Sequence, residues 1–127
     1  MDLSKLNTRN AAEKAADIYL RNPYTQEMLY GDDEQPIVFK MLGFQSTTGR
    51  NTILAQKRRK NSGVSEDQLA AELLAALCVG WSNNFEVGGE KPKFSKKEAE
   101  KLFLEEEWIA IQCSRFAAEL GNFNPEM

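Results

Sequence analysis

The last third of the chain, residues 94–123, most constrains the fold because a helix start, an apolar stripe and a helix stop follow one another there. Ser95 and Glu98 form the S-x-x-E capping box, in which each side chain satisfies a backbone N–H group of the first helical turn. The apolar residues after this box recur at steps of three, four or seven: Ala99, Leu102, Ile109, Cys113, Phe116 and Leu120. One face of this segment is therefore predicted to be buried.

A bend is expected in the middle of this segment, where residues 105–107, all glutamate, interrupt the apolar stripe. Three consecutive carboxylates suit the first turn of a new helix, because a helix N-terminus carries partial positive charge. The pattern predicts two helices, roughly 96–104 and 106–120, that meet at the bend. Residues 121–122 (Gly-Asn) are predicted to form a left-handed C-cap, with Phe123 folded back onto the last turn.

The first half of the chain predicts two short strands. The alternating segment 17–21 ends at Asn22-Pro23, where proline has no N–H group to offer, and the apolar run 37–43 follows an acidic turn. A short connection permits only antiparallel pairing. Since two strands alone are marginal in water, the ribbon must lie against helices or gain strands from another copy of the chain.

Two further helices are expected between the ribbon and the last third. Residues 46–47 (Ser-Thr) can cap a polar helix that continues to about residue 60. Ser65 and Gln68 make a second capping box, before an apolar helix that is predicted to end at Gly80. The glycine pair 88–89 predicts a tight turn, in either a short hairpin or a packed loop. The predicted fold class is α+β, a mainly helical single domain with a small antiparallel β-ribbon.

Composition is that of an ordinary globular domain. The 127 residues are 42% hydrophobic and 28% charged, which allows one core without a metal or a disulfide. We expect one domain over residues 1–127, with residues 1–9 and 122–127 loosely ordered. No apolar run approaches the roughly 18 residues that span a bilayer, and the first residues lack the apolar region of a signal peptide.

The absence of histidine excludes the commonest catalytic and metal chemistry. Ser-His-Asp and Cys-His nucleophile systems cannot form, and two separated cysteines cannot make an all-thiolate zinc site. Neither a G-x-x-x-x-G-K-[ST] nor a G-x-G-x-x-G loop is present to hold phosphates. We therefore expect no enzyme activity, no cofactor and no metal, with Cys78 and Cys113 as buried thiols on apolar helix faces.

Three groups of residues are candidates for protein interaction. They are the cations of the polar helix, the acidic turn before the second strand, and one tryptophan of the last helix: Arg50, Lys57, Arg58, Arg59 and Lys60; Asp32, Asp33 and Glu34; and Trp108. The cations could contact phosphates or an acidic protein surface, or only complement the helix dipole. A net charge of −3 and the lack of interleaved aromatic residues disfavour nucleic acid. Trp108 could serve either a partner surface or the core.

Several short motifs follow one another in an order that is typical of one protein family. In the first half these are Asn22-Pro23-Tyr24-Thr25, the strand Pro36–Gly43 and a hydroxyl-capped polar helix with basic residues. The second half contains Gly80-Trp81, Gly88-Gly89, Phe94-Ser95, Glu98-Ala99, Leu102, Trp108-Ile109, Gln112 and Asn122-Phe123. Over nearly the whole chain, this order resembles the tail assembly chaperones of long-tailed, non-contractile bacteriophages. Many members have proline before the Trp-Ile pair, where this chain has Glu107.

The resemblance implies a small non-catalytic phage protein that binds the tape measure protein in the host cell cytoplasm. Such a chaperone keeps the tape measure protein soluble, promotes tail tube polymerisation around it and is absent from the mature virion. Many members also have a longer frameshifted form, whose extension is thought to recruit the tail tube protein. Separated basic and acidic groups further predict salt-sensitive self-association into oligomers or filaments. Neither nucleic acid nor a membrane is expected as a partner.

Two other functions remain open on the sequence alone. The basic helix over 50–60 could lie on the phosphate backbone of DNA, as in a small phage regulator. The chain could also be a structural head–tail adaptor of the virion.

Overall fold

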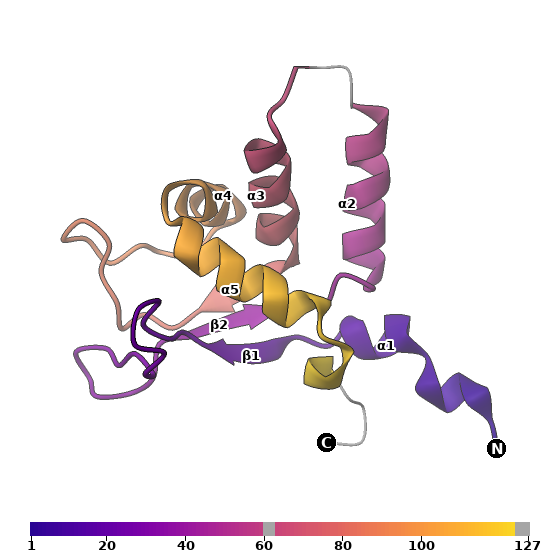
Figure 1. Cartoon of the computed structure of the whole chain (residues 1–127), viewed down its shortest axis with the longest axis horizontal. Helices are drawn as coiled ribbons and strands as arrows, with labels where there is room; N and C mark the ends of the chain where they lie inside the picture. The colour runs from indigo at the N-terminus through magenta and orange to yellow at the C-terminus, as the bar shows by residue number, and fades with distance from the viewer. Residues whose placement is uncertain (60–62, 124–127) are drawn as a thin grey trace.

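The computed structural model describes residues 1–59 and 63–123, in which helices cover one face of a three-stranded antiparallel sheet. The sheet has the order β1-β2-β3, made of β1 (Ala16–Tyr19), β2 (Val38–Met41) and β3 (Cys78–Trp81). The helices are η1 (Leu3–Leu6), α1 (Thr8–Ala12), α2 (Thr47–Arg58), α3 (Glu66–Leu77), α4 (Lys96–Glu105), α5 (Glu107–Ala118) and η2 (Leu120–Phe123). In Figure 1, α2 and α3 stand side by side above the sheet and α5 crosses in front of it. The predicted α+β class is confirmed.

The sheet contains one strand more than the predicted ribbon. β1 and β2 pair antiparallel as expected, with Ile18 opposite Phe39. The prediction that the apolar helix extends to Gly80 is wrong, because α3 ends at Leu77 and the next four residues form β3, in which Cys78, Gly80 and Trp81 pair with β2. The physical reason is that the second edge of β2 would otherwise lack hydrogen-bond partners. Lys96 Nζ supports the switch from helix to strand by donating to the carbonyl of Cys78 at 2.6 Å.

The three helix starts predicted at serine caps are confirmed. Ser46, Ser65 and Ser95 each accept a hydrogen bond from the backbone N–H three residues further along. The predicted bend is also confirmed, because α4 ends at Glu105 and Glu106 leaves helical geometry with φ −112° and ψ 76°. At each of the three serine caps, the hydroxyl accepts from a backbone N–H that has no partner within the first turn of its helix.

The predicted left-handed C-cap after the last helix is wrong. α5 ends at Ala118, Glu119 is extended, and the chain then turns into η2 without a positive φ at Gly121. A side chain replaces the expected cap, since Asn122 Nδ2 donates to the carbonyl of Phe116 at 2.9 Å. Phe123 folds back as predicted, with its ring 5.6 Å from that of Phe116 in a T-shaped arrangement.

The two chain ends that were expected to be loosely ordered contain short elements. η1 and α1 occupy most of residues 3–12, and Phe123 is buried. Residues 124–127 lie outside the described residues. The turn at 88–89 is confirmed, with positive φ at both glycines, but it closes only a single bridge between Val87 and Glu90.

The core is centred on Phe39 of β2, whose side chain has no exposed surface. Its ring centroid lies 5.3 Å from that of Trp81, 5.6 Å from Phe85 and 6.3 Å from Phe103. These rings come from β3, the following loop and α4, so one side chain joins the sheet to the helical layer. Offset and tilted aromatic pairs at these distances add to the stability gained from burial.

Phe39→Ala is expected to lower the free energy of unfolding by about 3–5 kcal/mol, because it removes a fully buried ring and leaves a cavity. Lys40→Ala is the matched control, since Lys40 is the next residue along β2 and its Nζ makes only an exposed 3.6 Å ion pair with Asp17. Its cost should stay below about 1 kcal/mol. Urea unfolding followed by far-ultraviolet circular dichroism measures both. Equal losses would contradict the central place of Phe39.

Candidate functional site

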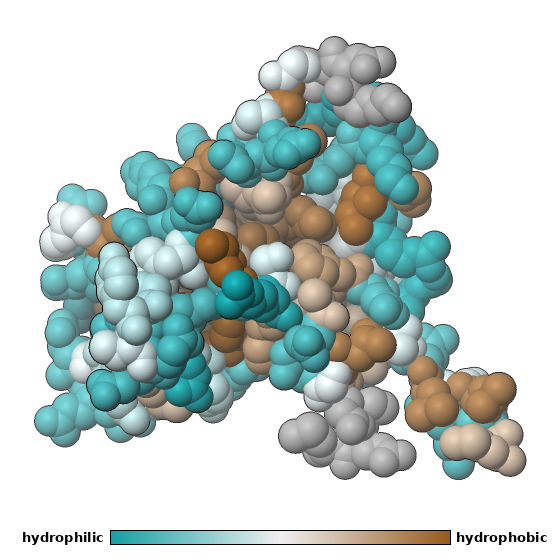
Figure 2. All heavy atoms as spheres, in the orientation of Figure 1, coloured by the Kyte–Doolittle hydropathy of each residue, from teal (hydrophilic) through white to brown (hydrophobic). Residues whose placement is uncertain are grey.

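The candidate site is an apolar groove between α3, α4 and α5, with a volume of about 450 Å³. Its lining comprises Phe44, Asp67, Ala70, Ala71, Leu73, Leu74, Phe103, Leu104, Glu107, Ala110, Ile111, Ser114 and Arg115. We call this surface the α3–α4–α5 groove. Figure 2 shows apolar surface over the region between α3 and α5 on the side that faces the viewer.

Two large apolar side chains of the groove remain accessible to a partner. Leu104 of α4 and Ile111 of α5 are each 42% exposed, although their neighbours Phe103 and Ala110 pack against the core. Ala70 of α3 and Ala110 of α5 carry only methyl groups, which leaves depth between the helices. Exposed apolar side chains that line a concave surface are typical of a protein interaction site.

The polar part of the groove is more acidic than basic. Asp67 of α3 and Glu107 of α5 contribute two carboxylates, and Arg115 contributes one guanidinium. Ser114 is a hydroxyl without a histidine to activate it, since the chain has none. The groove can therefore hold apolar side chains and favour nearby cations.

The structure divides the predicted basic group. Arg50 lies about 12 Å along the axis of α2 from Arg58, given a rise of about 1.5 Å per residue, and it borders a separate pocket with Arg9 and Phe44. Lys57 and Arg58 are exposed at the other end of α2. Lys60 lies outside the described residues. Among the described residues, Arg50 therefore lies apart from the cations at the end of α2.

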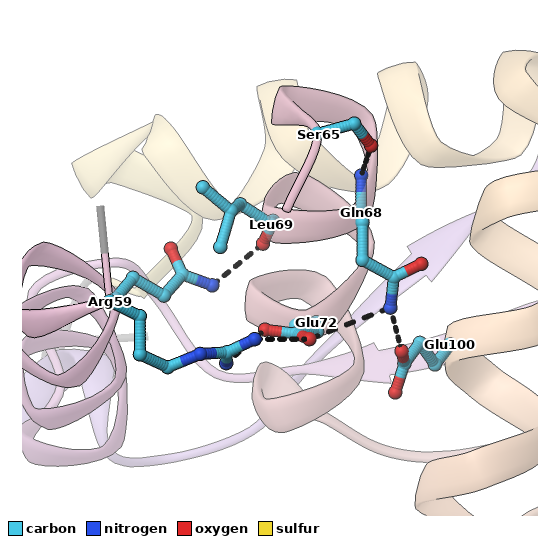
Figure 3. Close-up of polar contacts among 7 residues, drawn as sticks. Arg59, Ser65, Gln68, Leu69, Glu72 and Glu100 are labelled. Carbon is cyan, nitrogen blue, oxygen red and sulfur yellow. Dashed lines mark hydrogen bonds and ion pairs between the residues drawn. The ribbon is translucent and has the colours of Figure 1, made fainter. Parts of the chain in front are cut away.

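Arg59 contributes to contacts within the chain. Its Nη1 lies 2.9 Å from Oε2 of Glu72 on α3, an ion pair drawn near the centre of Figure 3. This guanidinium holds the pKa of Glu72 below its ordinary value. Gln68 Nε2 then donates to Glu72 and to Glu100 of α4, which links three helices. The pairing makes Arg59 a support for the helical layer.

The acidic turn is held by a buried amide. Asn84 Nδ2 donates to Asp33 Oδ1 at 3.0 Å and to the carbonyl of Gln35 at 2.9 Å, and the Asn84 contact lowers the pKa of Asp33. Position 31 requires glycine, because a Cβ atom there would lie 2.1 Å from the backbone carbonyl oxygen of Asn84. Asp32 and Glu34 remain exposed, with Asp32 Oδ2 3.7 Å from Lys91 Nζ.

Trp108 lies half-buried against the core, in contrast to the exposed partner-binding position that was one of its two predicted roles. Its Nε1 donates to Glu106 Oε2 at 3.2 Å, so the indole also bridges the bend between α4 and α5. Leu104 and Ile111 were not among the residues predicted from the sequence to form an interaction site. Their seven-residue spacing, just outside the main apolar stripe, is the signal that could have revealed a second apolar face.

Within the described chain, no group of three or more histidine, cysteine or acidic side chains could hold a metal ion. No helix among residues 1–59 and 63–123 has the length and apolar character needed to cross a membrane. Comparison of the chain with protein-family models, with curated proteins and with solved structures found no match.

Both cysteines are free and buried, as predicted, but only Cys113 lies on a helix, because Cys78 is the first residue of β3. Burial raises the pKa of the Cys78 thiol to about 11, and it also raises the pKa of the Cys113 thiol. Thiols in an unfolded chain ionise near pH 8.5, so above that pH the unfolded state loses protons that the folded state keeps. Stability must therefore fall as pH rises from about 9 to 11.

Cys78→Ala is expected to make this pH dependence shallower by up to about 1.4 kcal/mol per pH unit between about pH 9 and 11. Urea titrations of the unmodified chain and of the variant give the slope of the unfolding free energy against pH. A loss of stability that does not depend on pH, caused by the smaller side chain, does not change this slope. Parallel curves would show that the Cys78 thiol ionises equally well in the folded state.

Proposed function

We propose that this protein is a tail assembly chaperone of a long-tailed, non-contractile bacteriophage. It binds the tape measure protein in the host cell cytoplasm, keeps it soluble and promotes tail tube polymerisation, and it is not part of the mature virion. It acts without catalysis. The observation that supports this proposal best is the α3–α4–α5 groove, an apolar and partly acidic surface suited to a helical partner.

The groove fits the way in which amphipathic helices are recognised. Such a helix inserts apolar side chains spaced by three, four or seven residues into a hydrophobic groove. Leu104 and Ile111 supply accessible apolar contacts, and Asp67 and Glu107 favour a helix whose apolar face is bordered by lysine or arginine. A mostly helical tape measure protein would present many such faces, which would aggregate if they stayed uncovered.

Each single contact of this kind is weak, because a groove of about 450 Å³ holds only a few side chains and association itself is costly. Many copies bound along one tape measure protein would compensate through avidity. A longer frameshifted form would add an extension that recruits the tail tube protein, consistent with the family that the sequence resembles.

Charge distribution supports additional contacts between neighbouring copies. Lys57 and Arg58 lie at the end of α2, whereas Asp32 and Glu34 lie in the connection from β1 to β2, near the opposite end of the molecule in Figure 1. Opposite charges at two ends favour head-to-tail association, which is weakened by salt.

The proposal is tested by producing this protein together with the tape measure protein of the same phage, followed by size-exclusion chromatography with light scattering. We expect a soluble complex containing several copies of this chain per tape measure protein. If the tape measure protein precipitates while this chain elutes unchanged, the chaperone function is wrong. Stoichiometric amounts of this chain in purified phage particles would instead favour a head–tail adaptor.

Ile111→Asp is expected to weaken binding to the tape measure protein at least tenfold, because it places a carboxylate in the apolar part of the groove. Leu54→Asp is the matched control, since Leu54 is 49% exposed on α2 and does not line the groove. Both variants should stay folded by circular dichroism. Equal affinities, measured by titration calorimetry against a tape measure segment, would place the binding surface elsewhere.

A further inference from the structure

An apolar arm extends from the body at the N-terminal end of the described chain. This arm, residues 1–9, contains η1 and appears as a separate lobe with apolar surface in Figure 2. Leu3 is 71% exposed and Leu6 is 57% exposed. In a 3₁₀-helix, side chains three residues apart eclipse one another, so both leucines project from the same side of η1.

The arm has defined structure despite its exposure. Asp2 Oδ1 accepts from the backbone N–H of Ser4 at 2.9 Å and caps η1, and Asn7 Oδ1 accepts from Asn10 N–H at 3.0 Å and caps α1. Behind these caps, the carbonyl of Ala12 accepts from Gly43 N–H at 2.9 Å, which ties α1 to the segment after β2. Leu3 is therefore presented outward by an anchored element, and Leu6 remains more than half exposed although it also borders the body beside Leu120 and Phe123. Anchoring of the arm lowers the entropy lost on docking.

The arm and the α3–α4–α5 groove complement each other in apolarity and in charge. The charged side chains of the arm are Asp2, Lys5 and Arg9, and the Asp2 carboxylate already accepts hydrogen bonds from Ser4, so two cations outnumber one carboxylate. The groove offers Leu104 and Ile111 as partly exposed apolar contacts, together with two carboxylates and one guanidinium. A basic element with two aligned leucines thus matches an apolar groove with an acidic balance.

We propose that the arm of one copy docks into the α3–α4–α5 groove of a second copy. Leu3 and Leu6 enter the apolar part of the groove, and Lys5 and Arg9 face its carboxylates. A second copy is the occupant because the arm leaves the body beside η2 and points away from α3 and α4 of its own chain (Figure 1). Since arm and groove are different surfaces, each docked copy still offers one of each, and the contact can extend into chains of copies.

This contact would regulate the groove. Competition with the tape measure protein, the proposed client, rests on the proposed function, whereas docking of the arm onto a second copy does not. An arm in the groove covers Leu104 and Ile111 until a tape measure helix displaces it, so self-association and client binding compete for one surface.

The test uses two complementary variants of the full chain. Leu3→Asp/Leu6→Asp removes the arm contact and keeps the groove, whereas Ile111→Asp alters the groove and keeps the arm. All three substituted side chains are at least 42% exposed, so both variants should fold. Leu54→Asp, exposed on α2, serves as the control. Sedimentation velocity over a concentration series measures association of each protein alone and of the equimolar mixture.

We expect the unmodified chain and Leu54→Asp to associate with rising concentration, and each of the two test variants alone to associate at least tenfold more weakly. At a salt concentration that screens the charge contacts between the end of α2 and the acidic turn, their mixture should recover a complex of one copy of each and no larger species, because only one functional arm and one functional groove remain. A chain that stays monomeric, a Leu3→Asp/Leu6→Asp variant that associates normally, or a mixture that stays monomeric would each overturn the proposal. The arm variant should still bind the tape measure protein, so failure of docking and failure of the chaperone function give different results.

Discussion

The packing of Phe39 in the middle strand is the interaction on which the rest of the structure depends. β2 pairs with β1 on one edge and β3 on the other, and its fully buried ring contacts aromatic side chains from β3 and α4. A three-stranded sheet of four-residue strands has little stability of its own in water, so it requires this contact with a helical layer. The same contact fixes where α4 lies, and thereby where α5 begins after the bend.

The candidate site follows from how α4 and α5 present their apolar residues. Both helices have apolar faces wider than the core can cover, so Leu102 and Ile109 are buried while Leu104 and Ile111 remain 42% exposed. Alanines on α3 and α5 leave space between these side chains, and the result is a groove. Exposed apolar surface of this kind lowers the solubility of a domain. Natural sequences keep such surface chiefly where a partner covers it.

The proposed partners share this one groove, and their competition follows from its chemistry. A client helix and the arm of a second copy would both bring apolar side chains with flanking cations to a surface of two carboxylates and one guanidinium. Weak single contacts suit such a role, because a covered groove must open again when a better ligand arrives. The remaining charged residues, at the end of α2 and in the acidic turn, lie outside the groove and would affect how neighbouring copies align.

The sequence by itself determined the features that depend on neighbouring residues: the serine caps at 46, 65 and 95, the bend at 105–107 and the glycine turn at 88–89. Capping and turn formation involve residues within about four positions, so local patterns are sufficient to predict them. Only the tertiary structure decided that residues 78–81 form a strand, that Arg59 pairs with Glu72, and that Leu104 and Ile111 border one groove. Each of these depends on which distant segments meet, because the edge of β2, the carboxylate on α3 and the depth between the helices exist only after the chain has packed.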